Sequence, residues 1–413
     1  MKNIAIIGAG ISGLSIAHCL KNRFRIKVYE KDIRPGGLIK CNREEGHLYH
    51  IVGGHVFNSH RQDVLNWFWS FFDKEKEFVQ ASRNAIITMP NRQIVDYPIE
   101  NHLYMLDASL IHKIINELLT IAKNGYSPVK NFEEFLRMRF GDTLFEIYFQ
   151  PYNEKIWRTN LLNVPLSWLD GKLPMPTIEE IIYNNFIRGK DNKMVHSTFY
   201  YARHNGSQFL ADRLAEGLDI MYNIAVDSIK REGLQWSVNG EKFDKIIFCG
   251  NIKDLPEIVD DMCLCRYRDF INNLEYHGTT TVLCEIEQNP YSWIYLPDND
   301  YMAHRIICTG NFSPSNNANG KTTGTVEFTD ELSKQDIDIQ LSKMPFSPKY
   351  IAHRFTPYTY PVQSIGTRAT INELKNEMKK DDFYLLGRFA EWEYYNMDAA
   401  MGAALDLNKQ IIK

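Results

Sequence analysis

Three glycines near the start of the chain have the spacing of a phosphate-binding turn. Gly8, Gly10 and Gly13 stand between an apolar stretch and a segment with helical periodicity. Gly8 permits a tight turn, Gly10 lets the backbone approach a pyrophosphate at the helix N-terminus, and Gly13 permits close packing of helix and strand. Glu30 ends the next apolar stretch, where a carboxylate can accept protons from ribose hydroxyls. This combination predicts a bound dinucleotide.

Two further features favour FAD over NAD. The pair Gly36-Gly37 follows Glu30 closely, as a second glycine pair does in many flavoproteins that contact an extended cofactor. Near the other end of the chain, Gly387-Arg388 follows an expected strand and precedes an expected helix. An arginine there would balance the flavin pyrophosphate or face the isoalloxazine. We therefore expect FAD.

The elements that must position these residues form a mixed α/β pattern. The expected strands cover residues 4–7, 26–30, 244–249, 279–285, 293–296, 305–309, 325–328 and 384–386. Helices are expected at residues 12–20, over most of 104–186, and at the end of 383–412. The pattern predicts a Rossmann-like FAD-binding domain (1–75, 197–255 and 380–413), a helical insert with a mobile substrate loop (100–190), and a mainly antiparallel β-sheet substrate domain (76–99 and 256–379).

Bulk properties exclude several functional classes. The 413-residue chain has a net charge of −4, so no global basic field favours nucleic acid. It has no run of eighteen apolar residues, so no integral membrane association is expected. The seven cysteines are scattered, which indicates neither a disulfide framework nor a metal site and is typical of the cytoplasm.

Five segments spread along the chain together resemble the UDP-galactopyranose mutases. Each is modest alone, but five in order are specific, and they span nearly the whole chain. They are VGGHVFNSH (52–60), DYPIEN (96–101), PYNEKIW (151–157), WIYLP (293–297) with Arg305, and GRFAEWEYYNM (387–397). The resemblance implies a flavoenzyme that interconverts the pyranose and furanose forms of UDP-galactose, or of a related UDP- or dTDP-sugar, through attack of reduced-flavin N5 on the anomeric carbon.

The resemblance also assigns roles to residues. The carbonyl of Gly54 would accept the N5 proton, and His55 would contact the flavin or its ribityl chain. Arg305 and Lys172 would balance the departing diphosphate; the family usually has arginine at the second position, and lysine lacks its bidentate fork. The residues assigned to catalysis are Gly54, His55, Lys172, Arg305, Tyr360 and Tyr394. Those assigned to the cofactor are Gly8, Gly10, Ser12, Gly13, Glu30, Lys31, Gly36, Gly37, Leu38, His55, Gly387, Arg388, Asn396 and Met397.

The substrate residues follow from the same resemblance. Tyrosines would bracket the diphosphate and the sugar, because phenols donate to phosphate oxygens and keep an apolar wall. Glu100 stands where the eukaryotic enzymes have glutamine, and Asn396 where bacterial members have aspartate. A carboxylate accepts from pyrimidine N3–H but cannot donate to a carbonyl, so uridine and thymidine both stay open. The residues assigned to the substrate are Tyr97, Glu100, Asn101, Tyr148, Tyr152, Trp157, Lys172, Tyr295, Arg305, Tyr360 and Tyr394.

Two other functional hypotheses remain open at this point. One is a true FAD oxidoreductase of the amine-oxidase or protoporphyrinogen-oxidase type, which shares the cofactor fold but needs no paired cations for a diphosphate. The other is a flavin-bound scaffold without activity, which only the residues at 100, 172 and 396 support. The mutase interpretation further implies an external reductant such as NAD(P)H and a role in cell-surface polysaccharide biosynthesis. It leaves the oligomeric state open and allows a homo-oligomer.

Overall fold

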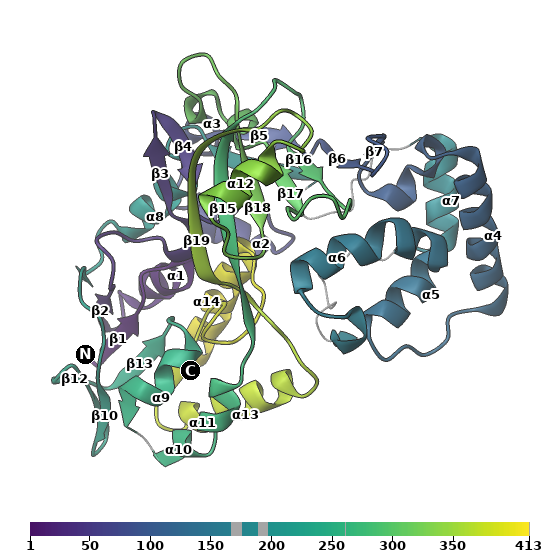
Figure 1. Cartoon of the computed structure of the whole chain (residues 1–413). Helices are drawn as coiled ribbons and strands as arrows, with labels where there is room; N and C mark the ends of the chain where they lie inside the picture. The colour runs from purple at the N-terminus through teal and green to yellow at the C-terminus, as the bar shows by residue number, and fades with distance from the viewer. Residues whose placement is uncertain (167–175, 189–196, 261, 413) are drawn as a thin grey trace.

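The computed structural model describes residues 1–166, 176–188, 197–260 and 262–412 (Figure 1). At its centre is a five-stranded parallel sheet in the order β20-β13-β1-β2-β9. The middle strand β1 (Asn3–Ile7) reads NIAII, and its last four residues are buried, as expected for a parallel strand between two layers. It pairs with β2 (Arg25–Tyr29) on one side and β13 (Lys245–Phe248) on the other, and β9 (Ile220–Met221) and β20 (Phe383–Leu385) form the two edges. Segments far apart in the sequence thus meet in one sheet.

Alternation along β1 builds a core on each face of this sheet. Ile4 and Ile6 pack among helices α1 (Ile11–Leu20), α8 (Gly206–Ala215), α14 (Met397–Ile411) and α2 (Gln62–Trp69). Ala5 and Ile7 pack on the opposite side, against α13 (Thr367–Lys379) and a small sheet of order β12-β11-β10-β14. The strands of that small sheet are β10 (Ile229–Glu232), β11 (Gln235–Val238), β12 (Glu241–Phe243) and β14 (Val259–Asp260).

A second large sheet has seven strands in the order β19-β15-β18-β17-β16-β6-β7, antiparallel except where β16 meets β6. One face packs on α12 (Lys334–Leu341) and the other on the helical part. Tyr295 and Arg305 are directly opposite each other on neighbouring strands, so their side chains share the face toward the helices. The strands are β6 (Ala85–Thr88), β7 (Ile94–Asp96), β15 (Tyr276–Glu285), β16 (Trp293–Tyr295), β17 (Arg305–Ile307), β18 (Thr323–Phe328) and β19 (Lys349–Pro361).

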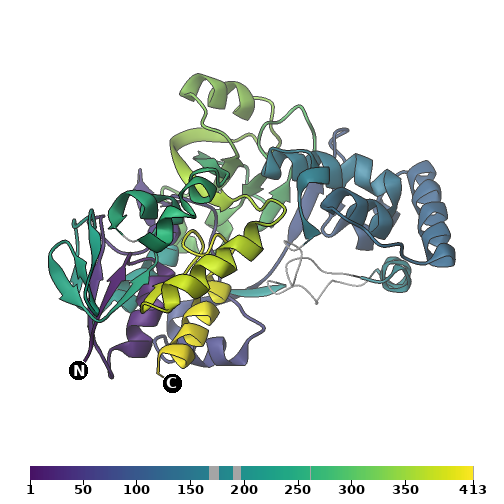
Figure 2. The ribbon, with the colours of Figure 1, turned by 90° about the horizontal axis from the view of Figure 1, so that it is seen from below.

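The helical part lies beside this sheet, away from the parallel one (Figures 1 and 2). It consists of η2 (Ile99–Asn101), η3 (Leu103–Met105), α4 (Ala108–Asn124), α5 (Phe132–Leu144), the π-helical turn η4 (Phe145–Phe149), α6 (Gln150–Trp157), η5 (Leu161–Asn163) and α7 (Ile178–Ile187). Lys155 fastens α6 to the sheet, because its partly buried ammonium donates to the carbonyls of Leu296, Asp298 and Ala303. The helices are therefore held against the strands that carry Tyr295 and Arg305.

The remaining helices and strands are short. They are η1 (Gly37–Ile39), β3 (Cys41–Glu44), β4 (His47–His50), α3 (Lys74–Glu77), β5 (Phe78–Ser82), β8 (Thr198–Ala202), η7 (Ile252–Asp254), α9 (Leu255–Ile258), α10 (Met262–Cys265), α11 (Arg268–Asn272), η8 (Thr309–Asn311) and η9 (Pro314–Asn316). Within the described ranges, no helix combines the length and the apolar character needed to cross a bilayer.

The expected fold class is confirmed: a Rossmann-like domain, a helical insert and a mainly antiparallel sheet. The strand expected at 305–309 ends earlier, at Ile307, because residues 309–311 turn into η8. The sequence analysis missed β19, whose residues KYIAHRFTPYTYP lack apolar alternation. It is an edge strand, where polar residues and proline are tolerated. The exact domain boundaries stay a prediction.

Candidate functional site

The first glycine turn leaves no space for larger residues. A Cβ built on Gly13 would lie 2.0 Å from the carbonyl oxygen of Gly8, which itself has a φ of +105°. Helix α1 then starts at Ile11 after Gly10, and no side chain among the described residues caps its first amides. Uncapped amides at a helix N-terminus, together with the helix dipole, attract an anion. The geometry thus fits the pyrophosphate that the glycine spacing predicts.

Glu30 is held in place by the turn that it faces. Its buried carboxylate accepts from the backbone N–H of Ala9 at 2.7 Å and of Asp32 at 3.0 Å. A carboxylate has about four acceptor positions, so two bonds to the backbone orient it and leave others for ribose hydroxyls. The arrangement fits the predicted role.

One cavity of about 600 Å³ joins all the residues that were assigned to the cofactor. They line it from the first turn to the loop before α14: Gly8, Gly10, Ser12, Gly13, Glu30, Lys31, Gly36, Gly37, Leu38, His55, Gly387, Arg388, Asn396 and Met397. The cavity also reaches residues 224–227, Asp254 and Tyr358, which the sequence analysis missed. A cavity of this size, lined by an uncapped helix start and a carboxylate, fits FAD.

His55 is neutral at ordinary pH. Its low-polarity surroundings, together with His50 and Arg388, lower its pKa to about 3. The carbonyl of Leu38 can only accept, so the His55 Nε2 at 3.0 Å must donate, and Nδ1 is left as an acceptor. On the same loop, a Cβ on Gly54 would lie 2.6 Å from the Ile307 side chain, so the backbone there passes close to β17.

Arg305 forms a buried ion pair with Glu327 of β18. Its Nε–H donates to the Glu327 carboxylate, whose side chain is only 2% exposed. Burial by itself would raise the pKa of Glu327, but Arg305 and His304 lower it to about 2. Glu327 therefore stays ionised and fixes the direction of the guanidinium. The outer end of Arg305, at Nη2, reaches the Tyr360 hydroxyl at 3.5 Å.

Two aromatic groups flank this ion pair. Tyr360 and Tyr394 stack with ring centres 5.5 Å apart. The second group holds four of the tyrosines assigned to the substrate. Tyr148 stacks on Tyr152 at 5.6 Å, Tyr152 meets Tyr295 edge-on at 5.3 Å, and Tyr295 meets Tyr97 at 4.7 Å. Arg305 lies on the same sheet face as Tyr295 and contacts Tyr360, so it joins the two groups.

The cofactor cavity and the aromatic groups share Arg388. Its Nε and Nη2 donate to the carbonyl of Tyr395, and Nη1 donates to that of Thr359. Its guanidinium carbon lies 4.6 Å from the centre of the Tyr394 ring. Arg388 lines the cavity, so residues that were assigned separately to the flavin and to the substrate form one continuous wall.

The remaining assigned residues lie at the edge of the helical part. Glu100 and Asn101 are both buried in η2. Asn185 of α7 donates to the Glu100 carbonyl at 2.8 Å, and Asn184 donates to the Asn101 side chain at 3.2 Å. Trp157 is buried at the end of α6. The expected mobile loop around Lys172, and Lys172 itself, lie outside the described residues.

Sequence reasoning missed Glu327, His304 and Arg83. A glutamate in the apolar run TVEF was a usable signal, because charged residues inside buried strands are normally paired. His304 precedes Arg305 and is fully buried beside Glu327, at 3.5 Å. Arg83 precedes β6 and lies among three aromatic rings, and no local motif marked it.

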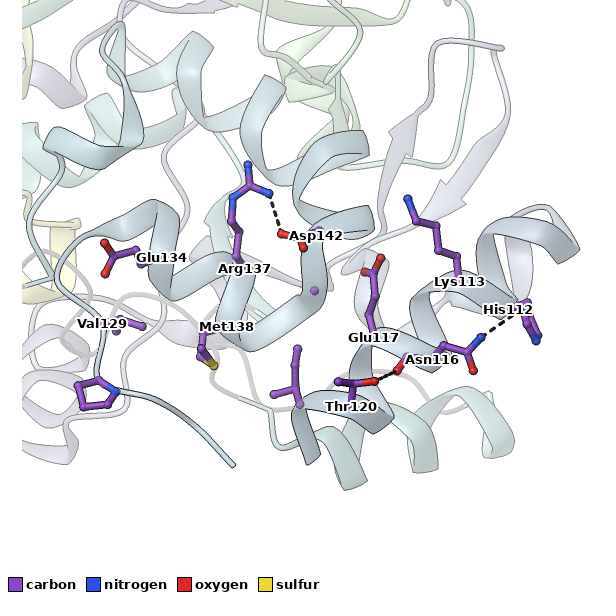
Figure 3. Close-up of a pocket in the computed structure, with 13 residues that line it drawn as sticks. His112, Lys113, Asn116, Glu117, Thr120, Val129, Glu134, Arg137, Met138 and Asp142 are labelled. Carbon is purple, nitrogen blue, oxygen red and sulfur yellow. Dashed lines mark hydrogen bonds and ion pairs between the residues drawn. The ribbon is translucent and has the colours of Figure 1, made fainter. Parts of the chain in front are cut away.

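A separate groove of about 740 Å³ lies between α4 and α5 (Figure 3), and none of the residues assigned above lines it. Two of its charged side chains, Arg137 and Glu117, are already engaged with neighbouring residues. Arg137 pairs with Glu133 at 2.9 Å and with Asp142 at 2.7 Å. Glu117 accepts from the backbone and the hydroxyl of Thr143. This groove therefore offers no comparable chemistry.

Known proteins resemble the chain over its whole length. Residues 6–74 match a family model described as an NAD(P)-binding Rossmann-like domain. UDP-galactopyranose mutase from Mycoplasma genitalium is 21% identical over 430 aligned residues, which cover 99% of this chain and 95% of that protein. The crystal structure of a reduced UDP-galactopyranose mutase matches with a TM-score of 0.89 and 21% identity, covering 100% of this chain and 94% of the other.

A putative protoporphyrinogen oxidase from Exiguobacterium sp. 255-15 matches less well, with a TM-score of 0.77 and 17% identity over 99% and 98% of the two chains. The resemblance that the separate motifs indicated is therefore confirmed along the whole chain. The same comparisons support the expectation that the chain is an enzyme, because the most similar of these proteins are mutases.

Proposed function

We propose that this chain is an FAD-dependent mutase that interconverts the pyranose and furanose forms of a nucleotide sugar, UDP-galactose or a related UDP- or dTDP-sugar. The observation that carries the proposal is the continuous wall from the cofactor cavity through Arg388, Tyr394 and Tyr360 to Arg305. This wall supports the proposal because a fixed cation and phenol donors beside the flavin end of a dinucleotide site are the combination needed to release a diphosphate next to a flavin.

The geometry supports specific roles for this chain's residues in cofactor binding. The uncapped start of α1 would hold the pyrophosphate, and Glu30 the ribose. Arg388 would face the flavin end, and neutral His55 would contact the flavin through its free Nδ1. When bound and reduced, FAD would supply a nucleophilic nitrogen for the anomeric carbon. The Gly54 carbonyl is proposed to accept the proton on that nitrogen.

The substrate residues would bind and orient the nucleotide sugar. Arg305, aimed by Glu327, would contact the diphosphate together with Lys172. The hydroxyls of Tyr295, Tyr360 and Tyr394 would donate to phosphate oxygens, while their rings exclude water from the anomeric carbon. A more stable departing diphosphate lowers the barrier to breaking the glycosidic bond.

The base would lie at η2. Tyr97 would stack on the pyrimidine, and Glu100 with Asn101 would meet its polar edge. Tyr148, Tyr152 and Trp157 would line the same pocket from η4 and α6. Uridine and thymidine remain alternative bases, and the proposal does not specify which sugar is bound. A cytoplasmic location, a role in cell-surface polysaccharide biosynthesis and reduction by NAD(P)H belong to the same proposal.

The test is direct. Purified protein with bound FAD is reduced with dithionite and incubated with UDP-galactopyranose, UDP-N-acetylgalactosamine or dTDP-fucose, and products are separated by chromatography. We expect the furanose form of at least one nucleotide sugar, and only with reduced protein. Failure to isomerise any of the three, with no flavin adduct trapped by cyanoborohydride, would refute the proposal.

An oxidoreductase of the protoporphyrinogen-oxidase or amine-oxidase type is the second candidate, favoured by the likeness in fold. Against the amine-oxidase type stands Arg305, since an oxidase of amines has no need of a cation for a diphosphate. Oxygen consumption with porphyrinogen or amine substrates, in the absence of furanose formation, would establish this alternative. Inactivity in both assays would favour the third interpretation, a flavin-bound scaffold without activity.

A further inference from the structure

Arg83 lies in a cage of aromatic rings on the sheet face that carries Tyr295. It stands between β5 and β6, and its backbone N–H donates to the carbonyl of Ser197 at 2.8 Å. Its guanidinium carbon lies 4.8 Å from the ring centre of Trp293, 5.1 Å from that of Tyr97 and 5.9 Å from that of Tyr295. The rings hold a cation through their π faces without neutralising its charge.

No carboxylate in the part of the chain that the structure describes forms an ion pair with Arg83. Its Nε is buried and lacks a hydrogen-bond partner among the same residues, although the residue as a whole keeps some exposure. Arg305 differs, because Glu327 compensates its charge. An arginine side chain is charged at any relevant pH, and a poorly solvated charge without a counter-ion is costly. Arg83 is therefore suited to an anion that arrives from solution.

The contact between Arg83 and Tyr295 sets the direction of a second donor. Arg83 Nη2 donates to the Tyr295 oxygen, so that oxygen acts as an acceptor there. The phenol proton of Tyr295 is then free to be donated elsewhere, and the adjacent positive charge makes it a stronger donor. Tyr295 is directly opposite Arg305 across the two strands, so this donor lies between two cations.

We infer that Arg83 binds the diphosphate of the substrate together with Tyr295, as a cation separate from Arg305. The inference rests on the proposed function, since it takes a nucleoside diphosphate as the ligand. Arg83 would supply net positive charge to the diphosphate site from within the described residues, in addition to any charge that Lys172 supplies. It also implies selectivity for nucleoside diphosphates over nucleosides, because the caged charge acts only on the phosphates.

The test compares ligands that differ only in phosphate. Calorimetry on FAD-loaded protein measures Kd for UDP and for uridine in the wild type, Arg83→Met and Arg83→Lys. Methionine removes the charge but fills similar space among the rings. We expect Arg83→Met to weaken UDP binding at least about tenfold and to leave uridine unchanged, and Arg83→Lys to restore part of the loss. Arg61→Met is the control, because Arg61 pairs with Asp63 and Asp406 at the surface, and UDP binding should not change.

Each outcome is decisive. Equal losses for UDP and uridine would show that Arg83 only shapes the pocket, and an unchanged UDP Kd would remove it from the site; both overturn the inference. Wild-type protein that binds no UDP would instead refute the proposed function itself. Retained FAD in the variants shows that they fold. Combining Arg83→Met with Tyr295→Phe should cost less than the sum of the two single changes, because both remove parts of one donor system.

Discussion

Replacing Glu327 with glutamine tests how strongly this buried carboxylate is coupled to Arg305. Glutamine keeps the shape and an oxygen that can accept from the Arg305 Nε–H, but it removes the charge. Arg305 and His304 lower the pKa of Glu327 from 4.5 to about 2. At roughly 1.4 kcal/mol per pKa unit, this depression corresponds to about 3 kcal/mol of folding stability. Because the side chain is only 2% exposed, solvent screens little of it.

The sign of the pH dependence follows from the direction of that pKa change. A carboxyl whose pKa is depressed on folding stabilises the protein above its unfolded pKa, and this contribution disappears as the pH falls through the folded pKa. The contribution of Glu327 is therefore complete at neutral pH and disappears between about pH 4.5 and about pH 2. The glutamine variant has no such dependence, so the stability gap between the two proteins should close over that interval.

Urea denaturation from pH 7 downward measures the gap. We expect Glu327→Gln to be less stable by about 3 kcal/mol at pH 7, with a smaller difference at each lower pH below 4.5. Glu285→Gln is the matched control on the same sheet, because Glu285 pairs with Lys321 at the surface and should cost no more than about 1 kcal/mol. A variant as stable as the wild type, or a gap that does not depend on pH, would refute the argument that this ion pair is strongly coupled.

Three further predictions concern single residues. Arg305→Ala should lower kcat/KM for the nucleotide sugar at least about 30-fold, or about 2 kcal/mol of transition-state stabilisation, and near wild-type turnover would remove Arg305 from the site. Gly13→Ala should abolish FAD retention, measured by flavin absorbance after gel filtration, because the new Cβ would lie 2.0 Å from the Gly8 carbonyl oxygen; full flavin content would contradict the predicted turn. The His55 imidazole, with a pKa of about 3, should stay neutral above about pH 4, and a titration near 6.5 in ¹⁵N NMR of labelled histidine would show that its surroundings are more polar than described.

The cofactor half of the site was predictable because its constraints are local. Gly8, Gly10 and Gly13 lie within one turn, and steric contact between close neighbours in the chain decides which residue fits. Glu30 follows after a single helix, so its position depends on one strand–helix–strand unit. Short-range sterics of this kind leave a readable spacing in the sequence. All the residues assigned to the cofactor accordingly line one cavity.

The substrate half depends on contacts that spacing does not encode. Glu327 meets Arg305 only because β17 and β18 pair in a particular register, and that register arises from the whole sheet. Arg83 is surrounded by rings from β16 and from the segment after β7, again through sheet order. Resemblance to a family identified Arg305 and the tyrosines. It did not identify the partners that orient them, because those were not part of the matching motifs.

In the proposed site, the two arginines would divide the binding of an anion between direction and charge. Arg305 and Glu327 together carry almost no net charge, so the pair is tolerable in the free protein and contributes an oriented donor more than attraction. Arg83 is surrounded by neutral rings, and its full positive charge remains available to a ligand. A site with only compensated cations would orient a diphosphate but attract it weakly, and one with only caged cations would attract it without a fixed geometry. Since the proposed reaction needs the anomeric carbon beside the flavin as the diphosphate departs, both kinds of cation are required on the same face of the sheet.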